Sequence, residues 1–182
     1  MTELTTDRLL LRQWKDSDHE PFAALNADPA VTEFFPRTFT RAESDELIAR
    51  TTALFDERGF GLWAVEVRET GQFIGFTGLA VPRFEAHFTP AVEIGWRLAK
   101  AAWGNGYAPE AARAALAYAF GPAGLDELVS FTATTNKPSQ RVMEKIGMTH
   151  DEADDFDHPS LAAGHPLQRH VLYRITRTQW EA

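Results

Sequence analysis

The sequence predicts a mixed α/β sandwich in which helices flank one central sheet. Helical patterns open the chain, a hairpin of alternating apolar residues lies near its middle, and strand and helix patterns then alternate toward its end. No internal repeat, low-complexity tract or linker interrupts this order. We therefore expect residues 1–182 to form a single domain, a length that allows a substantial core.

The first part of the chain is expected to hold one short strand and two helical starts. Leu9–Leu11 is an apolar run of strand length. Ser17 and Glu20 fit a capping box, in which two side chains satisfy free backbone N–H groups, and they predict a helix through about Ala24. Asp28, which a proline follows, predicts another short helical start.

A longer helix is predicted after Thr40, because Thr40 and Glu43 form a second capping box. Residues at the spacing of one buried helix face follow it: Leu47, Thr51, Leu54 and Phe55. Gly59 is suited to end this helix, since glycine readily adopts the left-handed conformation common there.

From Gly61 the sequence pattern changes to a period of two, which is typical of strands. Residues 61–67 and 73–79 form two such runs, and the turn between them contains a glycine. They predict a β-hairpin. Gly75 and Gly78 lie in its second strand, where glycine weakens pairing unless a backbone or a ligand approaches closely.

The chain is organised around a strand, Val92–Leu98, a glycine-bearing loop, and an alanine-rich helix that ends near Phe120. Pro109 is expected to be the first helical residue. Gly104 and Gly106 allow successive backbone N–H groups to turn inward, and the helix N-terminus adds partial positive charge. Such a loop favours a phosphate or pyrophosphate, although a plain strand-to-helix turn would have the same glycines.

The C-terminal third is expected to alternate between strands and one helix. Leu128–Thr134 is rich in β-forming residues and predicts a strand. A helix follows with Pro138 in its first turn and Gly147 as its terminator. Asp151–His165 is acidic and irregular, which predicts a long loop, and Val171–Ile175 predicts the last strand.

Composition narrows the possible functions. The formal net charge of −8 argues against nonspecific binding to nucleic acid or to an anionic membrane, since both require a basic face. The absence of cysteine excludes disulfides, thiolate metal sites and a cysteine acyl-enzyme. The chain begins without the basic and apolar regions of a signal peptide and has no membrane-spanning run, so we expect a cytoplasmic protein.

Three motifs resemble those of the GNAT N-acetyltransferases. Residues 103–109, Trp-Gly-Asn-Gly-Tyr-Ala-Pro, resemble the acyl-CoA pyrophosphate loop of that family, although Ala101 stands where the family carries Arg or Gln. Residues 6–12 look like the opening strand of the branch that contains the ribosomal-protein N-terminal acetyltransferases. Residues 136–148 resemble its second CoA-contacting motif. The resemblance implies a twisted, mostly antiparallel sheet that splays between residues 92–98 and 128–134, where acetyl-CoA would enter.

The resemblance also implies which residues hold acetyl-CoA. The backbone of Trp96 and Leu98 would bond the pantetheine amides, and Asn136 and Ser139 belong to the motif that contacts the pantetheine arm. Arg141 could reach a CoA phosphate. The backbone amides expected at the pyrophosphate are those of Trp103, Gly104, Asn105, Gly106, Tyr107 and Ala108.

Acetyl transfer by direct attack requires a base for the ammonium proton and a donor to the departing thiolate. Many members of the family use a tyrosine as that donor, but Met143 stands at the matching position here. Ser139 is the expected substitute, and its alternative role is a hydroxyl that bonds the helix start.

Glu93, on the strand beside the thioester, is the first candidate for the base. A period of two places it on one face with Gly95 and Arg97, whereas a β-bulge, which the family leads us to expect in this strand, would reverse that face. The alternatives are Asp157, His158 and His165. We expect no metal, because the histidine spacing fits no compact ligand motif.

The sequence therefore favours an acetyl-CoA-dependent N-acetyltransferase whose acceptor is a primary amine of a protein N-terminus or of a small molecule. One alternative is a non-catalytic module that binds or senses CoA on the same fold. Another is a protein-acylating enzyme that docks a peptide N-terminus in the groove beside the hairpin. We expect no nucleic-acid or membrane partner and either a monomer or a homodimer.

Overall fold

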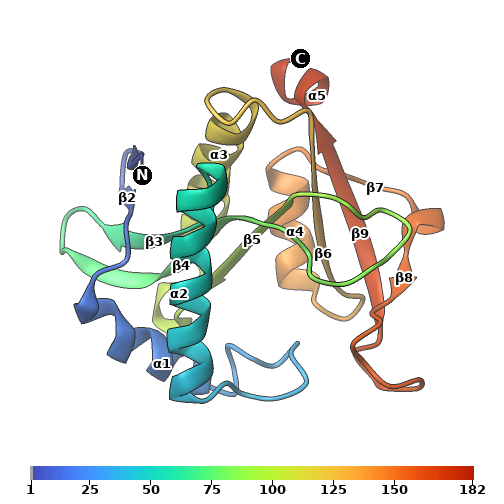
Figure 1. Cartoon of the computed structure of the whole chain (residues 1–182), viewed down its shortest axis with the longest axis horizontal. Coiled ribbons are helices and arrows are strands. Elements are labelled where there is room, and N and C mark those ends of the chain that lie inside the picture. The colour runs from blue at the N-terminus through green and yellow to red at the C-terminus, as the bar shows by residue number, and fades with distance from the viewer. Residues whose placement is uncertain (1) are drawn as a thin grey trace.

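The computed structural model describes residues 2–182, which form a nine-stranded sheet with helices on both faces (Figure 1). The strand order is β1-β2-β3-β4-β5-β6-β9-β7, and β8 pairs with β9. The strands are β1 (Leu4–Thr5), β2 (Leu9–Arg12), β3 (Leu62–Val67), β4 (Gln72–Ala80), β5 (Glu93–Leu98), β6 (Glu127–Ala133), β7 (Thr149–His150), β8 (Phe156–Asp157) and β9 (Arg169–Thr176). The helices are α1 (His19–Ala27), α2 (Arg41–Arg58), α3 (Tyr107–Phe120), α4 (Lys137–Lys145) and α5 (Arg177–Glu181), with short 3₁₀ turns η1 (Asp16–Asp18), η2 (Lys100–Ala102) and η3 (Glu152–Asp154).

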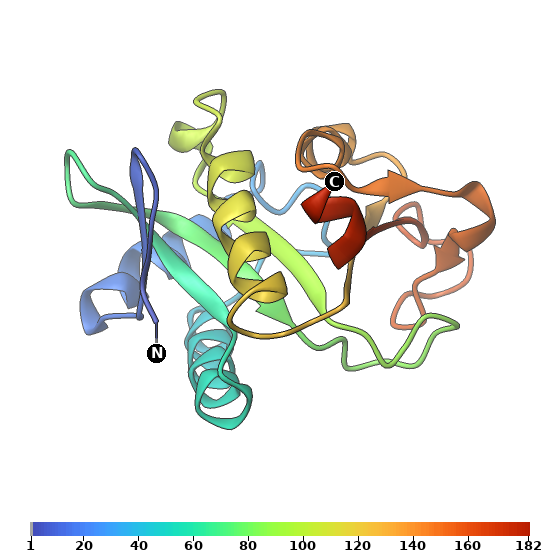
Figure 2. The same cartoon turned by 90° about the horizontal axis from the view of Figure 1, so that it is seen from above.

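The helices cover the two faces of the sheet separately. Figure 2 shows α3 and α4 on one side and α1 and α2 on the other. Side chains of β5 alternate between these sides, as the pleat requires. Ile94 and Leu98 pack in the core cluster that contains α3, whereas Phe76, which lies opposite Arg97 on β4, packs with Phe22 of α1.

The sheet opens between β5 and β6, the neighbouring strands that run parallel. Glu93 and Val129 form the one register pair between them in the described residues, and the N–H of Val129 donates to the carbonyl of Val92 at 3.0 Å. Beyond this point the strands diverge (Figure 1). The predicted splay between these two strands is therefore present.

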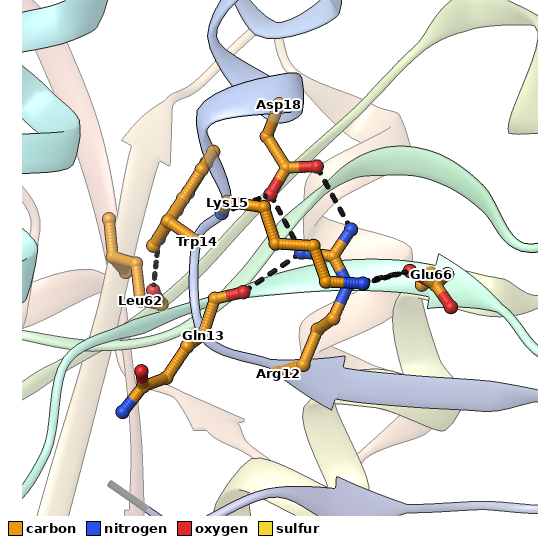
Figure 3. Close-up of polar contacts among 7 residues, drawn as sticks. All are labelled: Arg12, Gln13, Trp14, Lys15, Asp18, Leu62 and Glu66. Atoms are coloured by element: carbon orange, nitrogen blue, oxygen red, sulfur yellow. Dashed lines mark hydrogen bonds and ion pairs between the residues drawn. The ribbon is translucent and has the colours of Figure 1, made fainter.

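A buried ion-pair cluster attaches the N-terminal segment to the sheet (Figure 3). Both terminal nitrogens of Arg12 donate to the carboxylate of Asp18, at 2.6 and 2.9 Å, and Nε donates to Glu66 at 2.6 Å. The side chains of Arg12 and Asp18 are almost fully buried, at 4% and 2% exposed. The indole of Trp14 also donates to the carbonyl of Leu62 at 2.8 Å, so the cluster joins β2, η1 and β3.

Several sequence predictions are confirmed. The hydroxyl of Thr40 accepts from the N–H of Glu43 at 3.2 Å, and the carboxylate of Glu43 accepts from the N–H of Thr40 at 2.8 Å. Gly59 ends α2 with φ of 76°. The hairpin of β3 and β4 lies within a few residues of its predicted range. The same is true of strands β5, β6 and β9 and of helix α4, whereas β1, β7 and α5 were not predicted.

The helix predicted through about Ala24 is present as α1, but its predicted cap and the helical start predicted after Asp28 were wrong. Ser17 does not cap this helix but lies inside η1, and the carboxylate of Asp18 accepts from the N–H of Lys15 at 2.8 Å instead. After Asp28 the chain forms hydrogen-bonded turns and no helix, with the Asp28 carboxylate accepting from the N–H of Ala30 at 2.8 Å. Aspartate can satisfy such local turns as readily as it caps a helix, so the residue type does not distinguish the two.

Two other boundaries also differ. Helix α3 begins at Tyr107, two residues before Pro109. The helix accommodates a proline there because first-turn N–H groups have no intrahelical partner. The region 151–165, expected as a loop, carries η3 and β8, because β8 pairs with the extended β9 through Asp157 and Arg169.

Gly75 is required by its neighbours in the sheet. A β-carbon at Gly75 would lie 2.1 Å from the carbonyl oxygen of Arg97, and its φ is 135°. The close approach that the sequence predicted at this position is therefore made by the backbone of β5.

Candidate active site

The glycine loop, residues 103–108, presents free backbone donors at the start of α3. Gly104 and Gly106 have φ of 79° and 76°, which the left-handed region allows for glycine at little cost. The N–H groups of residues 104–108 have no hydrogen-bond acceptor within residues 2–182. The N–H of Trp103 differs from the expectation, since it donates to the carbonyl of Lys100 at 3.1 Å and so closes η2. Five free donors at a helix N-terminus can hold an anion.

Arg8 fixes the shape of this loop from the other end of the sequence. Its Nη1 donates to the carbonyl of Asn105 at 2.8 Å, and its Nε donates to Glu110 at 2.7 Å. Its guanidinium also lies over the ring of Tyr107, 4.8 Å from the centroid. Burial would raise the pKa of Glu110, but hydrogen bonds from Thr6 and Arg8 outweigh it and lower that pKa. Sequence reasoning missed this role, because about one hundred residues separate the partners.

The edge of β5 that faces β6 carries unpaired backbone groups. The N–H of Ala99 donates to the carbonyl of Ile74 at 2.8 Å, and alternate residues of an antiparallel pair point away from the partner strand. Trp96 and Leu98 therefore direct their backbone groups toward the side on which β6 has diverged. The carbonyl of Leu98 accepts from the indole of Trp103 at 2.8 Å, whereas Trp96 has no such partner in the described residues.

Glu93 lies where β5 and β6 begin to part. The pairs between β4 and β5 run without a shift from Gly75–Leu98 to Ala80–Glu93, so the bulge expected in β5 is absent and that expectation was wrong. A register shift occurs instead between β3 and β4. Glu93 thus faces the α1–α2 side of the sheet with Gly95, where an added β-carbon would lie 3.7 Å from Glu93 Oε1.

The carboxyl group of Glu93 is partly accessible but has protein on most sides. Within residues 2–182 it makes no ion pair. Burial raises its pKa to about 8. A carboxylate in this environment can accept a proton near neutral pH, whereas an exposed one is too acidic to do so.

The first turn of α4 lies at the opposite, wider end of the parted strands, because β5 and β6 run parallel and α4 follows β6. Asn136 caps this helix: its Oδ1 accepts from the N–H of Ser139 at 3.2 Å and its Nδ2 donates to Thr132 at 2.8 Å. The hydroxyl of Ser139 has no hydrogen-bond partner in the described residues, so it does not serve as the helix-start cap that was its alternative role. Met143 is buried in the core, at 1% exposed.

Arg141 is exposed on α4 and makes no ion pair with residues 2–182. It follows the half-buried Ser139 by two residues on the first turns of the helix. Its charge is therefore free for an external partner.

The other candidate bases are engaged in local contacts. His158 packs against Phe84, with ring centroids 4.6 Å apart, and burial lowers its pKa. Its Nδ1 accepts from the N–H of Ser160 at 3.2 Å, so the neutral ring carries its proton on Nε2 and offers no free lone pair. Asp157 pairs with Arg169 at 3.3 Å on the surface. His165 Nδ1 likewise accepts a backbone N–H, from Leu167 at 3.1 Å.

Residues 2–182 contain no group of three or more His, Asp or Glu side chains arranged to hold a metal ion. None of the helices they form is both long enough and apolar enough to cross a bilayer. A groove of about 590 Å³ lies between α1 and η2, bordered by Leu25, Phe73 and Lys100, and none of the candidate site residues lines it.

Similarity to known proteins gives independent evidence of the family to which this chain belongs. Residues 8–149 match the acetyltransferase (GNAT) domain family. The FsC-acetyl coenzyme A-N(2)-transacetylase of Aspergillus fumigatus is 37% identical over 178 residues, which cover 90% of this chain and 72% of that protein. The crystal structure of an acetyltransferase from Agrobacterium tumefaciens is 29% identical, with a TM-score of 0.78 and coverage of 96% and 94%.

A third similarity concerns the fold. The ribosomal L7/L12 α-N-protein acetyltransferase RimL, solved in complex with coenzyme A, superposes with a TM-score of 0.76 over 96% of this chain and 98% of that chain. Its sequence identity is 15%, so it supports the shared fold and not a shared acceptor.

Proposed function

This chain belongs to the GNAT acetyltransferases, and from that premise we propose that it transfers an acetyl group from acetyl-CoA to a primary amine by direct attack within a ternary complex. The family and the named activities of its relatives make it an acetyl-CoA-dependent N-acetyltransferase. The acceptor and the residues that act on it are the proposal. The observation that carries it is the wedge between β5 and β6, with five free amides at its wide end and an isolated carboxyl group at its narrow end.

The residues at the wide end fit the carrier. The N–H groups of residues 104–108 would hold the pyrophosphate, and the free backbone of Trp96 would bond the pantetheine amides, as one strand bonds another. Leu98 retains its N–H for the same purpose, since Trp103 occupies only its carbonyl. Asn136 keeps one amide hydrogen beyond its capping bonds, and Arg141 would pair with a phosphate. When bound, acetyl-CoA supplies the thioester carbonyl that the amine attacks.

At the narrow end, Glu93 would take the proton that the acceptor ammonium must lose. A base is most effective when its pKa lies near the working pH, and burial brings the pKa of Glu93 to about 8. His158 is the weaker candidate, because its Nδ1 already accepts a backbone N–H.

Ser139 would donate to the departing thiolate. Its hydroxyl is uncommitted, whereas Met143, which stands at the usual tyrosine position, has no donor and is buried. A hydroxyl that makes no internal hydrogen bond is free to bond the sulfur or the pantetheine arm.

An amine nitrogen as the acceptor is supported by the Aspergillus relative, whose name specifies transfer to an N(2) position. Both a small-molecule amine and a protein N-terminus provide such a nitrogen.

The test is release of CoA thiol from acetyl-CoA in the presence of a broad panel of amines and peptides, with acetylated product identified by mass spectrometry. We expect amine-dependent release. Stabilisation of the protein by CoA without product from any amine would contradict the transfer and favour a CoA-sensing module.

A further inference from the structure

Arg97 carries a charge that the protein does not neutralise. Its side chain extends from β5 on the α1–α2 side of the sheet, and no carboxylate within residues 2–182 pairs with it. Its Nη1 donates to Asn26 Oδ1 at 2.6 Å. Its Nε is buried without any partner, and Nη2 makes no hydrogen bond in the described residues either. Burial lowers the pKa of this guanidinium to about 10.

Aromatic rings hold the guanidinium in place. Its central carbon lies 4.3 Å from the ring centroid of Phe35, 4.7 Å from that of Phe39 and 5.4 Å from that of Phe76. These contacts attract a cation and fix its plane, but they give no hydrogen bond to its N–H groups. We call these three rings the aromatic box. Phe35 is 36% exposed, so the aromatic box opens to solvent beside Phe35.

Arg12 shows how this chain treats a buried arginine whose role is structural. Each of its three nitrogens donates to a carboxylate, of Asp18 or Glu66. Leaving a buried charge without such partners strongly destabilises a folded protein. The contrast indicates that the partner of Arg97 comes from outside the chain.

The free edge of the guanidinium defines the chemistry of that partner. Nε–H and the adjacent Nη2–H lie side by side in the plane of the group and form the fork that a carboxylate accepts with two oxygens. The edge faces no internal acceptor, whereas the opposite nitrogen is fixed by Asn26.

Glu93 and Arg97 lie on one face of β5, roughly 13 Å apart along the strand, with Gly95 between them. Gly95 has no side chain, and a β-carbon there would meet only the Glu93 carboxylate. The surface between the base and the cation is therefore low and open. The glycine loop, which we propose holds the pyrophosphate, lies at the start of α3 on the other side of the sheet.

We propose that the acceptor is an amine that also bears a carboxylate, which the Nε–Nη2 edge of Arg97 binds while the amine lies toward Glu93. This inference rests on the proposed acetyl transfer and adds the class of its substrate. A simple amine or a polyamine, which has no carboxylate, would leave the Nε–Nη2 edge of Arg97 without a partner.

The test compares ω-amino carboxylates of increasing chain length with their primary amides, which present the same amine without the charge. We expect wild-type protein to prefer each well-fitting acid over its amide by about tenfold or more in kcat/KM, the value of one charge-assisted contact. Arg97→Gln should abolish that preference with little change in KM for acetyl-CoA. Arg97→Lys, which keeps the charge but loses the fork, should restore only part of it. Arg50→Gln, on the exposed face of α2, is the matched control.

The outcomes separate the two proposals. Equal turnover of acid and amide by wild-type protein, or a preference that persists in Arg97→Gln, would overturn the assignment of Arg97 and leave acetyl transfer intact. Absence of turnover with every amine would contradict the transfer itself. In that case, or if Arg97→Gln does not fold, the Arg97 Nε–H resonance of the wild-type protein is followed by NMR during titration with sodium acetate. A saturable shift supports the carboxylate site, and no shift overturns it.

Discussion

Glu93 pairs with Val129 at the point where β5 and β6 separate, so a carboxyl group without an ion-pair partner in the described residues stands at the apex of the wedge. The position of Glu93 also determines where Gly95 and Arg97 lie. Because β5 continues without a bulge, Gly95 and then Arg97 follow Glu93 on its own face. The two roles that we propose, proton transfer by Glu93 and acceptor binding by Arg97, therefore lie on one short strand.

Glu93→Gln should remove the base and its titration together. We expect kcat of the wild-type enzyme to rise with pH toward a plateau with an apparent pKa near 8, and kcat of the variant to be lower by about a hundredfold or more without that inflection. Rates measured from pH 6 to 9.5 with saturating acetyl-CoA and amine test this. His158→Gln should retain the inflection; its loss there instead would transfer the base role to His158.

The same group makes folding stability depend on pH. The folded-state pKa of Glu93 is raised, so its contribution to stability is fully present below the unfolded pKa of about 4.5 and is lost as pH rises toward about 8. Urea denaturation should show Glu93→Gln gaining stability relative to wild type across that range. A difference between the two proteins that does not change with pH would contradict the raised pKa.

Gly106→Val should weaken CoA binding by placing a branched side chain at φ of 76° beside Arg8, which distorts the glycine loop. We expect the dissociation constant for CoA, measured by calorimetry, to rise about tenfold or more, the value of a lost charge-assisted hydrogen bond. Gly124→Val is the matched control, because Gly124 has φ of 66° with open space around it beyond the far end of α3. An unchanged CoA affinity in Gly106→Val would reject the loop as the pyrophosphate site.

The sequence was sufficient for the order of the longer elements, because period-two and helical patterns, capping boxes and glycine terminators are local signals. It did not predict the short elements β1, β7, β8 and α5. It was sufficient for the glycine loop for the same reason. It failed where one residue type serves several local structures, as with Ser17 and Asp28, whose short polar side chains suit turns as well as helix caps.

Long-range contacts account for the rest of what the sequence did not predict. The Arg8–Glu110 contact, the Arg12–Asp18–Glu66 cluster and the aromatic box around Arg97 all join segments distant in sequence. The face of Glu93 also depended on a bulge, and bulges are set by pairing geometry that a single strand does not encode.

Ser139→Ala should lower kcat more than it weakens CoA binding. A general acid typically contributes about a hundredfold or more, so a loss of that order in kcat with an unchanged dissociation constant for CoA identifies the thiolate donor. The helix itself should persist, since Asn136 and not Ser139 supplies the capping side chain. Ser160→Ala, at an exposed position outside the wedge, is the control. A rate equal to wild type would remove Ser139 from the chemistry, and a loss confined to CoA affinity would make it a binding residue.

Asp18→Asn should destabilise the fold without touching the wedge (Figure 3). The substitution leaves the buried Arg12 with only Glu66 as a charged partner, and breaking a buried pair costs about 3–5 kcal/mol. Urea denaturation measures the loss of stability in Asp18→Asn, and Asp16→Asn, on the exposed side of the same turn, should be about as stable as wild type.

The same cluster should make stability depend on pH through Glu66. Burial would raise the pKa of Glu66, but the hydrogen bonds from Arg12 and Lys15 outweigh it and lower that pKa. The Glu66 contribution is therefore present above the unfolded pKa and is lost as pH falls through the folded value, so acid should narrow the gap between Glu66→Gln and wild type. A gap of constant size from pH 7 to pH 3 would show that the cluster acts through packing and not through charge.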